Sequence, residues 1–194
     1  MEKVKNSLLW TEEGYNIFAK EGLDGIQIER LARIVQLNKS GFYYYFGDLD
    51  GYCVELIRMH EKKVNTFLES ITLLKKLDPD YLLLLIEYAP TVMFQVQLTR
   101  HKEIHSFYQA SERVDHLLNI AVRPLWNEFL GIHGSPDLAM RYFHTVRDMF
   151  YTRISFQNLN YQFLHDFATE AKSLVVEIAK RRPPEPANSL RAVK

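Results

Sequence analysis

The chain contains a single cysteine, Cys53, among its 194 residues, so it forms no intrachain disulfide and fits a reducing compartment. Glycine and proline are also scarce, with 8 and 7 residues, which argues against turn-rich β architectures. The most hydrophobic run, residues 82–86, is far too short to cross a bilayer, and the first residues lack the apolar core of a signal peptide. These absences predict a cytoplasmic protein with no membrane association.

The chain also lacks net charge at pH 7, because 24 Lys and Arg residues balance 24 Asp and Glu residues. A protein that coats nucleic acid non-specifically needs a strong basic surplus, so this balance excludes that class. A small patch that reads one defined site stays compatible with it. The twelve Phe and eleven Tyr residues can build both a core and a ligand cavity.

Hydrophobic residues recur at helical spacing along the whole chain, whereas strand-like alternation is hard to find. Asn38 and Asp48 are placed to cap helices, and Gly22 and Gly47 to end them. Pro124 is expected, like Pro90, to bend or restart its helix. The predicted helices cover residues 3–21, 27–35, 39–46, a long stretch after Asp48 that passes Phe67, and 81–97, 100–109, 111–131, 137–157 and 160–181.

These helices predict an all-α protein with two parts and a tail. Residues 1–47 are expected to form a three-helix domain, and residues 48–182 a helical bundle. The clearest loop covers residues 131–136. The Pro-Pro-Glu-Pro stretch after Arg182 cannot continue a helix, so residues 183–194 are expected to be a loose tail.

Two short helices joined by a three-residue turn are typical of a helix-turn-helix, whose second helix enters the major groove of DNA. The sequence itself adds a family signal in residues 17–22 (IFAKEG), 31–32 (LA) and 37–46 (LNKSGFYYYF). These pieces and their spacing resemble the N-terminal domain of TetR-family transcriptional regulators. The resemblance covers about residues 8–60, and the rest of the chain matches the family only in length and helical character.

The resemblance implies a transcriptional regulator, in the first instance a repressor, that binds a palindromic site in double-stranded DNA as a homodimer. It places a small aromatic core at the recognition helix, formed by Phe42, Tyr45 and Phe46. It assigns the DNA contacts to the start of the second helix and to the recognition helix, at Gln27, Lys39, Ser40, Gly41, Tyr43 and Tyr44.

The resemblance also implies an unknown small-molecule effector that binds among the middle helices and releases the DNA. Large side chains with polar tips suit a mostly apolar effector, and the candidates are Tyr88, Met93, Phe107, Tyr108, His144, Arg147 and Tyr151. The last two helices are expected to form the dimer interface, through Phe143, Phe150, Phe163, Phe167, Ala171 and Leu174. Both sets could instead fill the core of a single chain.

A second hypothesis is a helical interaction module that keeps the helix-turn-helix fold without specific DNA binding. Residues 1–50 carry six Lys and Arg against eight Asp and Glu, a poor balance for a DNA-binding surface. Ile26 stands where the family usually has a Thr that contacts phosphate, and Leu49 stands where it commonly has a Lys. These three features support the second hypothesis, while the DNA-binding regulator remains the leading one.

A third hypothesis, a helical enzyme or metal protein, has the weakest support in the sequence. His101 and His105 have the i, i+4 spacing of a metal site, as do Glu112 and His116, but seven histidines in a helical chain produce such pairs by chance. Cys53 is expected to be a buried, inert thiol. No catalytic group, metal ligand or cofactor is assigned.

Overall fold

The structure is a computed structural model that describes residues 2–131 and 136–181, and helices are the only regular secondary structure in those ranges. The all-α prediction is therefore confirmed. Most of the expected loop at 131–136 and the expected tail at 183–194 lie outside the described residues. The elements are α1 (Glu2–Glu21), η1 (Leu23–Gly25), α2 (Ile28–Val35), α3 (Lys39–Phe46), α4 (Leu49–Ile71), η2 (Leu77–Tyr81), α5 (Leu82–Glu87), α6 (Ala89–Arg100), α7 (His105–Leu130), α8 (Pro136–Arg153) and α9 (Tyr161–Arg181).

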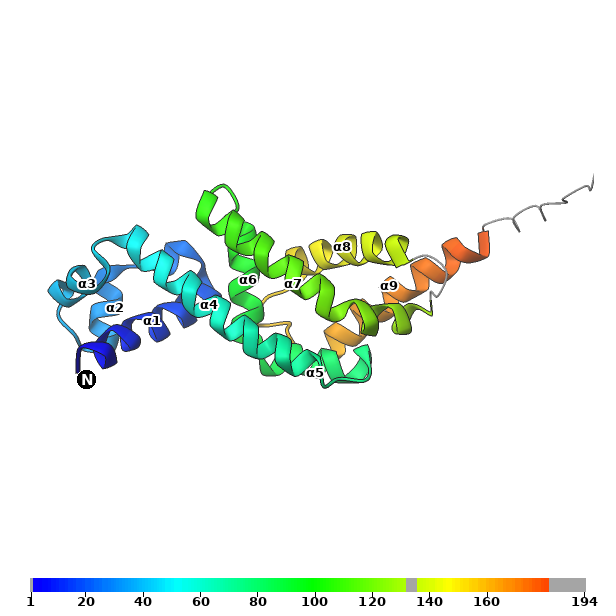
Figure 1. Cartoon of the computed structure of the whole chain (residues 1–194), viewed down its shortest axis with the longest axis horizontal. Helices are drawn as coiled ribbons and strands as arrows, with labels where there is room; N and C mark the ends of the chain where they lie inside the picture. Colours follow the sequence, from blue (N-terminus) through cyan, green and yellow to red (C-terminus); the bar gives the residue numbers. More distant parts are fainter. Residues whose placement is uncertain (1, 132–135, 182–194) are drawn as a thin grey trace, which may run out of the picture.

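The molecule is elongated, with α1, α2 and α3 at one end and α9 at the other (Figure 1). The long helix α4 leads from the first end into the bundle formed by α5 to α9. Helix α1 packs against α4 and α6, and α7 packs against α4, α6 and α8. One continuous hydrophobic core extends from Trp10 in α1 to Ala171 in α9. The N-terminal helices are therefore docked onto the bundle through α4 and α6.

The ends of the N-terminal helices follow the signals in the sequence. The Asn38 side chain accepts a hydrogen bond from the backbone N–H of Ser40 at 3.2 Å, and the Asp48 side chain accepts one from that of Gly51 at 2.8 Å. Gly22 follows α1 with a φ of 70°, a left-handed value that favours glycine. Both predicted caps and the predicted end of the first helix are confirmed.

Close packing fixes α1 against α4. The Tyr52 hydroxyl donates a hydrogen bond to the Trp10 carbonyl at 2.5 Å, and the Tyr52 ring packs against Phe42 of α3 with ring centroids 4.9 Å apart. A Cβ atom at Gly14 would lie 1.7 Å from the Tyr52 hydroxyl oxygen, so only glycine fits at this point. Tyr52 thus holds α1, α3 and α4 together.

The expected helix over residues 81–97 is wrong in its extent. The chain forms η2 and α5 first, breaks at Tyr88, and continues as α6. Pro90 lies in the first turn of α6, where a missing backbone N–H costs nothing. The prediction that Pro90 restarts a helix is therefore confirmed.

The two helices expected over 100–109 and 111–131 are one helix, α7, and the break lies earlier, at residues 101–104. Pro124 lies inside α7 without ending it. The carbonyl that loses its partner belongs to Ile120, on the exposed side of the helix, while Leu125 and Trp126 are buried on the other side. Burial of the inner face thus outweighs one hydrogen bond lost on the outer face.

No single helix in the described ranges is long and apolar enough to cross a membrane. The bent pair Leu77–Glu87 and Ala89–Arg100, with an angle of 83° between its members, passes the same test of length and composition when taken together. Both members contribute to the hydrophobic core, among others through Leu82, Leu85 and Phe94.

Candidate functional site

The residues that the sequence singled out for DNA contact lie on one exposed part of the molecule. Helices α2 and α3 are joined by residues 36–38, and Gln36 closes α2 in the left-handed conformation. The residues with exposed side chains are Gln27, Lys39, Ser40, Tyr43 and Tyr44, and Gly41 is partly exposed. Phe42 is fully buried, and Tyr45 and Phe46 pack against the core, as expected. Helix α3 therefore presents polar and aromatic groups outward while its other face anchors it.

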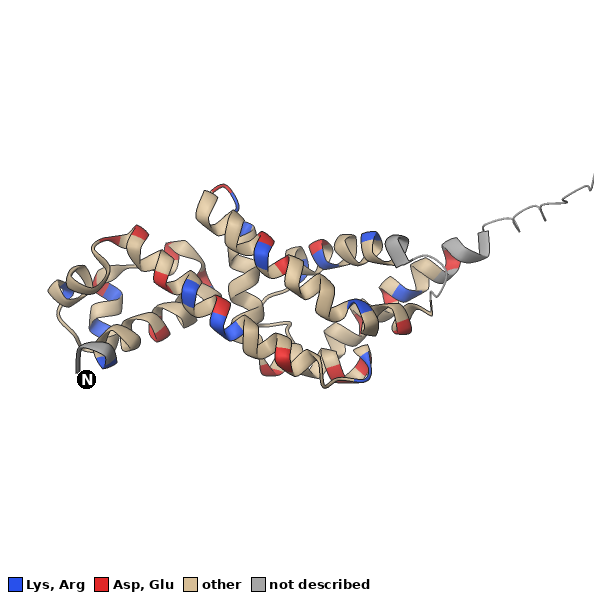
Figure 2. Ribbon diagram, viewed as in Figure 1, with Lys and Arg blue, Asp and Glu red and all other residues tan. Residues whose placement is uncertain are grey.

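This exposed surface carries opposite charges in close pairs. The Lys39 ammonium lies 2.9 Å from the Glu29 carboxylate, and Arg30 donates two hydrogen bonds to Glu21, at 2.5 and 2.7 Å. The hydrogen bond to Glu29 raises the pKa of Lys39, and the same bond lowers the pKa of Glu29. Figure 2 shows Lys, Arg, Asp and Glu interspersed over the N-terminal helices. Two of the basic groups there are thus engaged by acidic neighbours.

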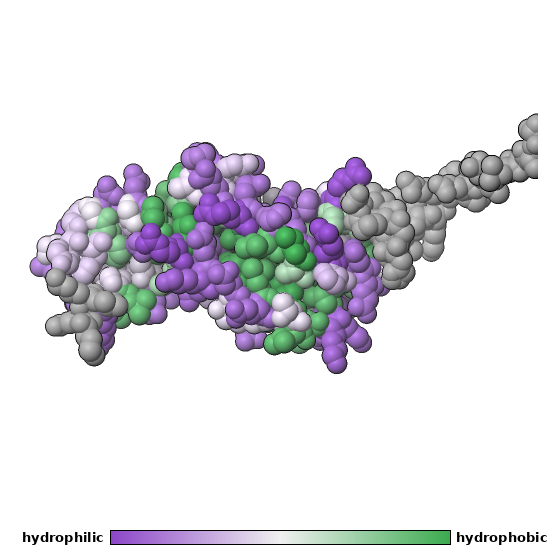
Figure 3. Space-filling model, in the orientation of Figure 1, coloured by the Kyte–Doolittle hydropathy of each residue, from purple (hydrophilic) through white to green (hydrophobic). Residues whose placement is uncertain are grey.

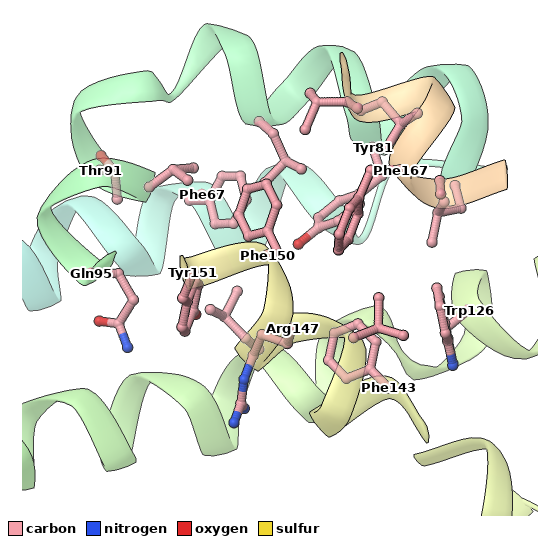
Figure 4. Close-up of a pocket in the computed structure, with 18 of the residues that line it drawn as sticks. Phe67, Tyr81, Thr91, Gln95, Trp126, Phe143, Arg147, Phe150, Tyr151 and Phe167 are labelled. Carbon is pink, nitrogen blue, oxygen red and sulfur yellow. The ribbon is translucent and has the colours of Figure 1, made fainter. Parts of the chain in front are cut away.

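A second feature is a cavity of about 100 Å³ inside the bundle. Helices α4 to α9 and the turn η2 all contribute side chains to it, and aromatic rings form much of its wall (Figure 4). The labelled lining residues in Figure 4 are Phe67, Tyr81, Thr91, Gln95, Trp126, Phe143, Arg147, Phe150, Tyr151 and Phe167. A concave, mostly apolar space with a few polar groups is the usual form of a small-molecule site.

Two of the seven predicted effector residues, Arg147 and Tyr151, line this cavity. The other five predicted residues do not line the cavity. Met93 and Phe107 are buried elsewhere in the core, Tyr108 borders an outer groove, and His144 is exposed on α8. Tyr88 hydrogen-bonds to Ser70, with 3.1 Å between the hydroxyl oxygens, and packs on Phe67 without lining the cavity.

Half of the predicted dimer residues also lie around the cavity. Phe143, Phe150 and Phe167 line it, so their rings point into their own chain. Ala171 is buried, and its carbonyl accepts a hydrogen bond from the Tyr142 hydroxyl at 2.6 Å. Phe163 is partly exposed and Leu174 is exposed. Leu174 is thus the most exposed of the six residues, and Phe163, Phe150 and Phe167 are partly exposed.

A buried polar cluster borders the cavity on the side of α6, α7 and α8. Asp115, whose side chain is 9% exposed, accepts hydrogen bonds from the Gln95 amide and the Tyr151 hydroxyl, each at 2.9 Å. Arg147 lies 3.4 Å from Asp115 and also donates to Asn119 at 3.0 Å. Burial raises the pKa of Asp115, and the positive charge of Arg147 works in the opposite direction. The cluster thus places a charged pair immediately behind the apolar wall.

A line of hydrogen bonds connects this cluster to helix α1. Tyr15 lies 2.9 Å from His60 Nδ1, His60 Nε2 lies 3.1 Å from Gln95 Oε1, and Gln95 Nε2 donates to Asp115. Because a carboxylate only accepts, Gln95 must turn its amide N–H toward Asp115 and its oxygen toward His60. His60 then donates from Nε2, and Tyr15 donates to Nδ1. Every donor in the line points toward Asp115, which polarises successive bonds in the same sense.

The buried His60 makes stability depend on pH. Burial lowers the pKa of His60 from 6.5 to about 4. Between these values the unfolded chain binds a proton that the folded protein does not. The free energy of unfolding should therefore fall as pH drops from 6.5 toward 4, by up to about 1.4 kcal/mol per pH unit from this group. Denaturant titrations from about pH 7 to about pH 5 measure it.

His60→Gln is the control, since glutamine does not titrate. Asp115 acts in the opposite direction, because its raised pKa favours the folded protein at lower pH, and that contribution is lost as pH rises. The Asp115 contribution is common to both proteins. The difference between their slopes of unfolding free energy against pH therefore isolates the contribution of His60. Equal slopes for the wild type and His60→Gln would contradict the assignment.

The remaining titratable candidates show no grouped chemistry. Cys53 is buried, as predicted, and burial raises the pKa of its thiol to about 11. His101 lies in the turn between α6 and α7, so it does not share a helical face with His105, which begins α7. Within the described residues, no three His, Cys, Asp or Glu side chains are grouped as a metal site would require.

Sequence reasoning missed Phe67, Tyr81 and Trp126 as cavity residues. Tyr81 follows the Asp-Pro-Asp stretch that marks the start of a helix. This signal places Tyr81 in the first turn of that helix. The direction of the Tyr81 side chain depends on the geometry of η2, which no local pattern specifies.

No protein-family model, curated protein or solved structure matches the chain.

Proposed function

We propose that the chain is a cytoplasmic transcriptional regulator that binds double-stranded DNA as a homodimer through a helix-turn-helix formed by α2 and α3. A small effector that occupies the cavity in α4 to α9 changes its DNA affinity. The observation that carries this proposal is the exposed first turn of α3, which follows a three-residue turn and the Asn38 cap. A short recognition helix needs such an exposed N-terminal end, because its first residues meet the base edges.

The surface chemistry of α3 supports contact with DNA. Lys39 and Ser40 can donate to phosphates, and Tyr43 and Tyr44, which are 53% and 64% exposed, can donate to phosphates or base edges. The Phe42 ring packs against the Trp10 ring with centroids 5.4 Å apart. This contact holds α3 in a fixed position for docking on DNA.

The line of hydrogen bonds from Asp115 to Tyr15 supports the coupling between cavity and DNA. It connects α8, α7, α6 and α4 to α1, and α1 packs directly on α2 and α3. An effector changes DNA affinity only if it binds the two states of the protein with different affinity. A polar cluster with directional bonds has two distinct arrangements available, bonded and broken, which suits such a switch.

The dimer is the second part of the proposal, and α9 carries its exposed apolar surface. We expect Leu174→Glu to weaken dimerisation by at least about tenfold, because the two-fold axis would bring like charges together. Sedimentation velocity of the purified chain measures the monomer fraction. Leu73→Glu, at an 82% exposed position after α4, is the matched control and should stay dimeric. Dissociation of both variants alike, or of neither, would move the interface elsewhere.

Another exposed apolar surface must be weighed against α9. Figure 3 shows hydrophobic side chains gathered over the middle of the molecule, where α4 and α7 face the viewer. Leu117 and Ile120 of α7 are among the exposed large hydrophobic residues. If Leu174→Glu stays dimeric, Ile120→Glu is the next variant to test.

The competing hypothesis is a protein-interaction module that uses the same fold without reading DNA. The Glu29–Lys39 and Glu21–Arg30 pairs favour it, since both neutralise basic groups near the proposed DNA surface. Selection of genomic fragments by the purified protein at moderate salt, followed by sequencing, separates the two. The proposal predicts enrichment of a short inverted repeat, and weaker enrichment in Lys39→Ala. No enrichment at any salt concentration would favour the interaction module.

A further inference from the structure

The cavity wall offers no exposed charge to a ligand. Among the described residues, Arg147 is the only ionised side chain that lines it. Its guanidinium is directed away from the cavity (Figure 4) and is engaged by Asp115, Asn119 and Asp148, the last at 3.1 Å. A charged ligand group in the cavity would therefore lose its water without gaining a partner. This arrangement selects neutral ligands.

One polar group in the wall is unsatisfied. Figure 4 shows the Tyr81 hydroxyl directed into the cavity, and it makes no hydrogen bond within the described part of the chain. Three other polar side chains in the wall have partners: Gln95 and Tyr151 bond to Asp115, and the Trp126 indole N–H donates to the Ala139 carbonyl at 3.0 Å. Burial also raises the pKa of Tyr81, so its hydroxyl stays a neutral donor. A hydroxyl that faces the cavity without a protein partner is free to bond to a ligand there.

Volume and shape limit the ligand to one ring. The cavity measures about 100 Å³, and an apolar cavity of roughly 150 Å³ in another protein binds benzene. Phe67 and Phe150 lie beside the Tyr81 ring (Figure 4), so a planar aromatic guest can stack or meet these rings edge to face. A ligand larger than one ring would exceed this volume.

We propose that the cavity binds a neutral, single-ring aromatic compound with one hydroxyl or carbonyl group, such as a phenol or an aromatic aldehyde. The ring lies among Phe67, Phe143 and Phe150, and the polar group bonds to the Tyr81 hydroxyl. Its role as the effector rests on the proposed function, whereas the binding itself does not.

The matched ligands are phenol and toluene, which differ by one hydroxyl in place of a methyl group, together with benzoate as an anionic ligand. Isothermal titration of the purified full chain, without DNA, gives the three affinities. The wild type should bind phenol more tightly than toluene, and benzoate at least about tenfold more weakly than phenol. Tyr81→Phe should weaken phenol binding by about three- to tenfold and leave toluene binding unchanged, because one neutral hydrogen bond is lost.

Two further variants make the test decisive. Tyr88→Phe removes a hydroxyl outside the cavity and should leave all three affinities unchanged. Ala168→Leu fills the cavity and should abolish phenol and toluene binding while thermal stability is kept. The proposal is overturned if phenol binds no better than toluene, if Tyr81→Phe leaves phenol affinity unchanged, or if Ala168→Leu binds as the wild type does. Since no DNA is present, failure here leaves the DNA-binding proposal intact, and failure of DNA selection leaves this one intact.

Discussion

Asp115→Ala should lower the free energy of unfolding by about 3 kcal/mol, measured by urea denaturation. The substitution leaves the Tyr151 hydroxyl without its acceptor and takes the buried partner from Arg147. The Gln95 amide loses one acceptor but keeps the Ser111 carbonyl at 3.1 Å. Each unsatisfied buried group costs about 1–3 kcal/mol, and removing one partner of a buried ion pair costs more than the pair contributes. The exposed Asp148 still neutralises part of the Arg147 charge, which keeps the estimate at the lower end of the range for broken buried pairs.

Asp148→Ala is the matched control for this prediction. It removes a carboxylate from the same guanidinium, but the Asp148 side chain is 67% exposed, so the cost should stay below about 1 kcal/mol. Asp115→Asn should fall between the two, since it keeps an acceptor oxygen and loses the charge. Equal losses for Asp115→Ala and Asp148→Ala would show that burial of the cluster contributes nothing.

Opposite effects on DNA affinity are expected from the two residues of the Glu29–Lys39 pair. Lys39→Ala should weaken binding to the selected fragment by about tenfold, which is about 1.4 kcal/mol, and lower the salt slope by about one. Glu29→Gln should strengthen binding severalfold, because it releases the Lys39 ammonium and removes a negative charge near the phosphates. Fluorescence anisotropy with a labelled fragment measures both constants.

Lys20→Ala is the control for this pair of variants, because Lys20 is an exposed lysine near the end of α1 and outside the proposed DNA surface. It should change the affinity by less than about twofold. If Glu29→Gln weakened binding as Lys39→Ala does, the pair would be needed for the fold of α2 and α3. The interpretation of Lys39 as a phosphate contact would then be wrong.

The N-terminal helices could be predicted from the sequence because their signals are local. The oxygen of Asn38 or Asp48 caps the helix that follows it, and Gly22 allows the left-handed residue that ends α1. The inner face of α2, with Leu31 and Ala32, follows directly from helical periodicity. Such features depend on neighbours within a few residues and need no knowledge of the tertiary fold.

The cavity could not be predicted in the same way. Its wall combines residues from seven elements, and whether a tyrosine faces it depends on how those elements pack. Tyr88 and Tyr81 are only seven residues apart, yet Tyr81 lines the cavity and Tyr88 bonds to Ser70 outside it. The apolar stripes of α8 and α9 could have formed either a dimer interface or the core of a single chain. In the structure the rings of Phe150 and Phe167 line the cavity of their own chain. Periodicity shows which face of a helix is apolar and does not show what covers it.

The proposed DNA binding is tested best by the salt dependence of binding to a selected genomic fragment. A DNA-reading dimer should show log K falling linearly with log salt concentration, with a slope of about −0.9 for each phosphate neutralised and several phosphates per dimer. The slope should be shallower in Lys39→Ala. A binding constant that does not change with salt, or no fragment bound at any salt concentration, would rule out DNA reading and leave the N-terminal helices as a surface for protein partners.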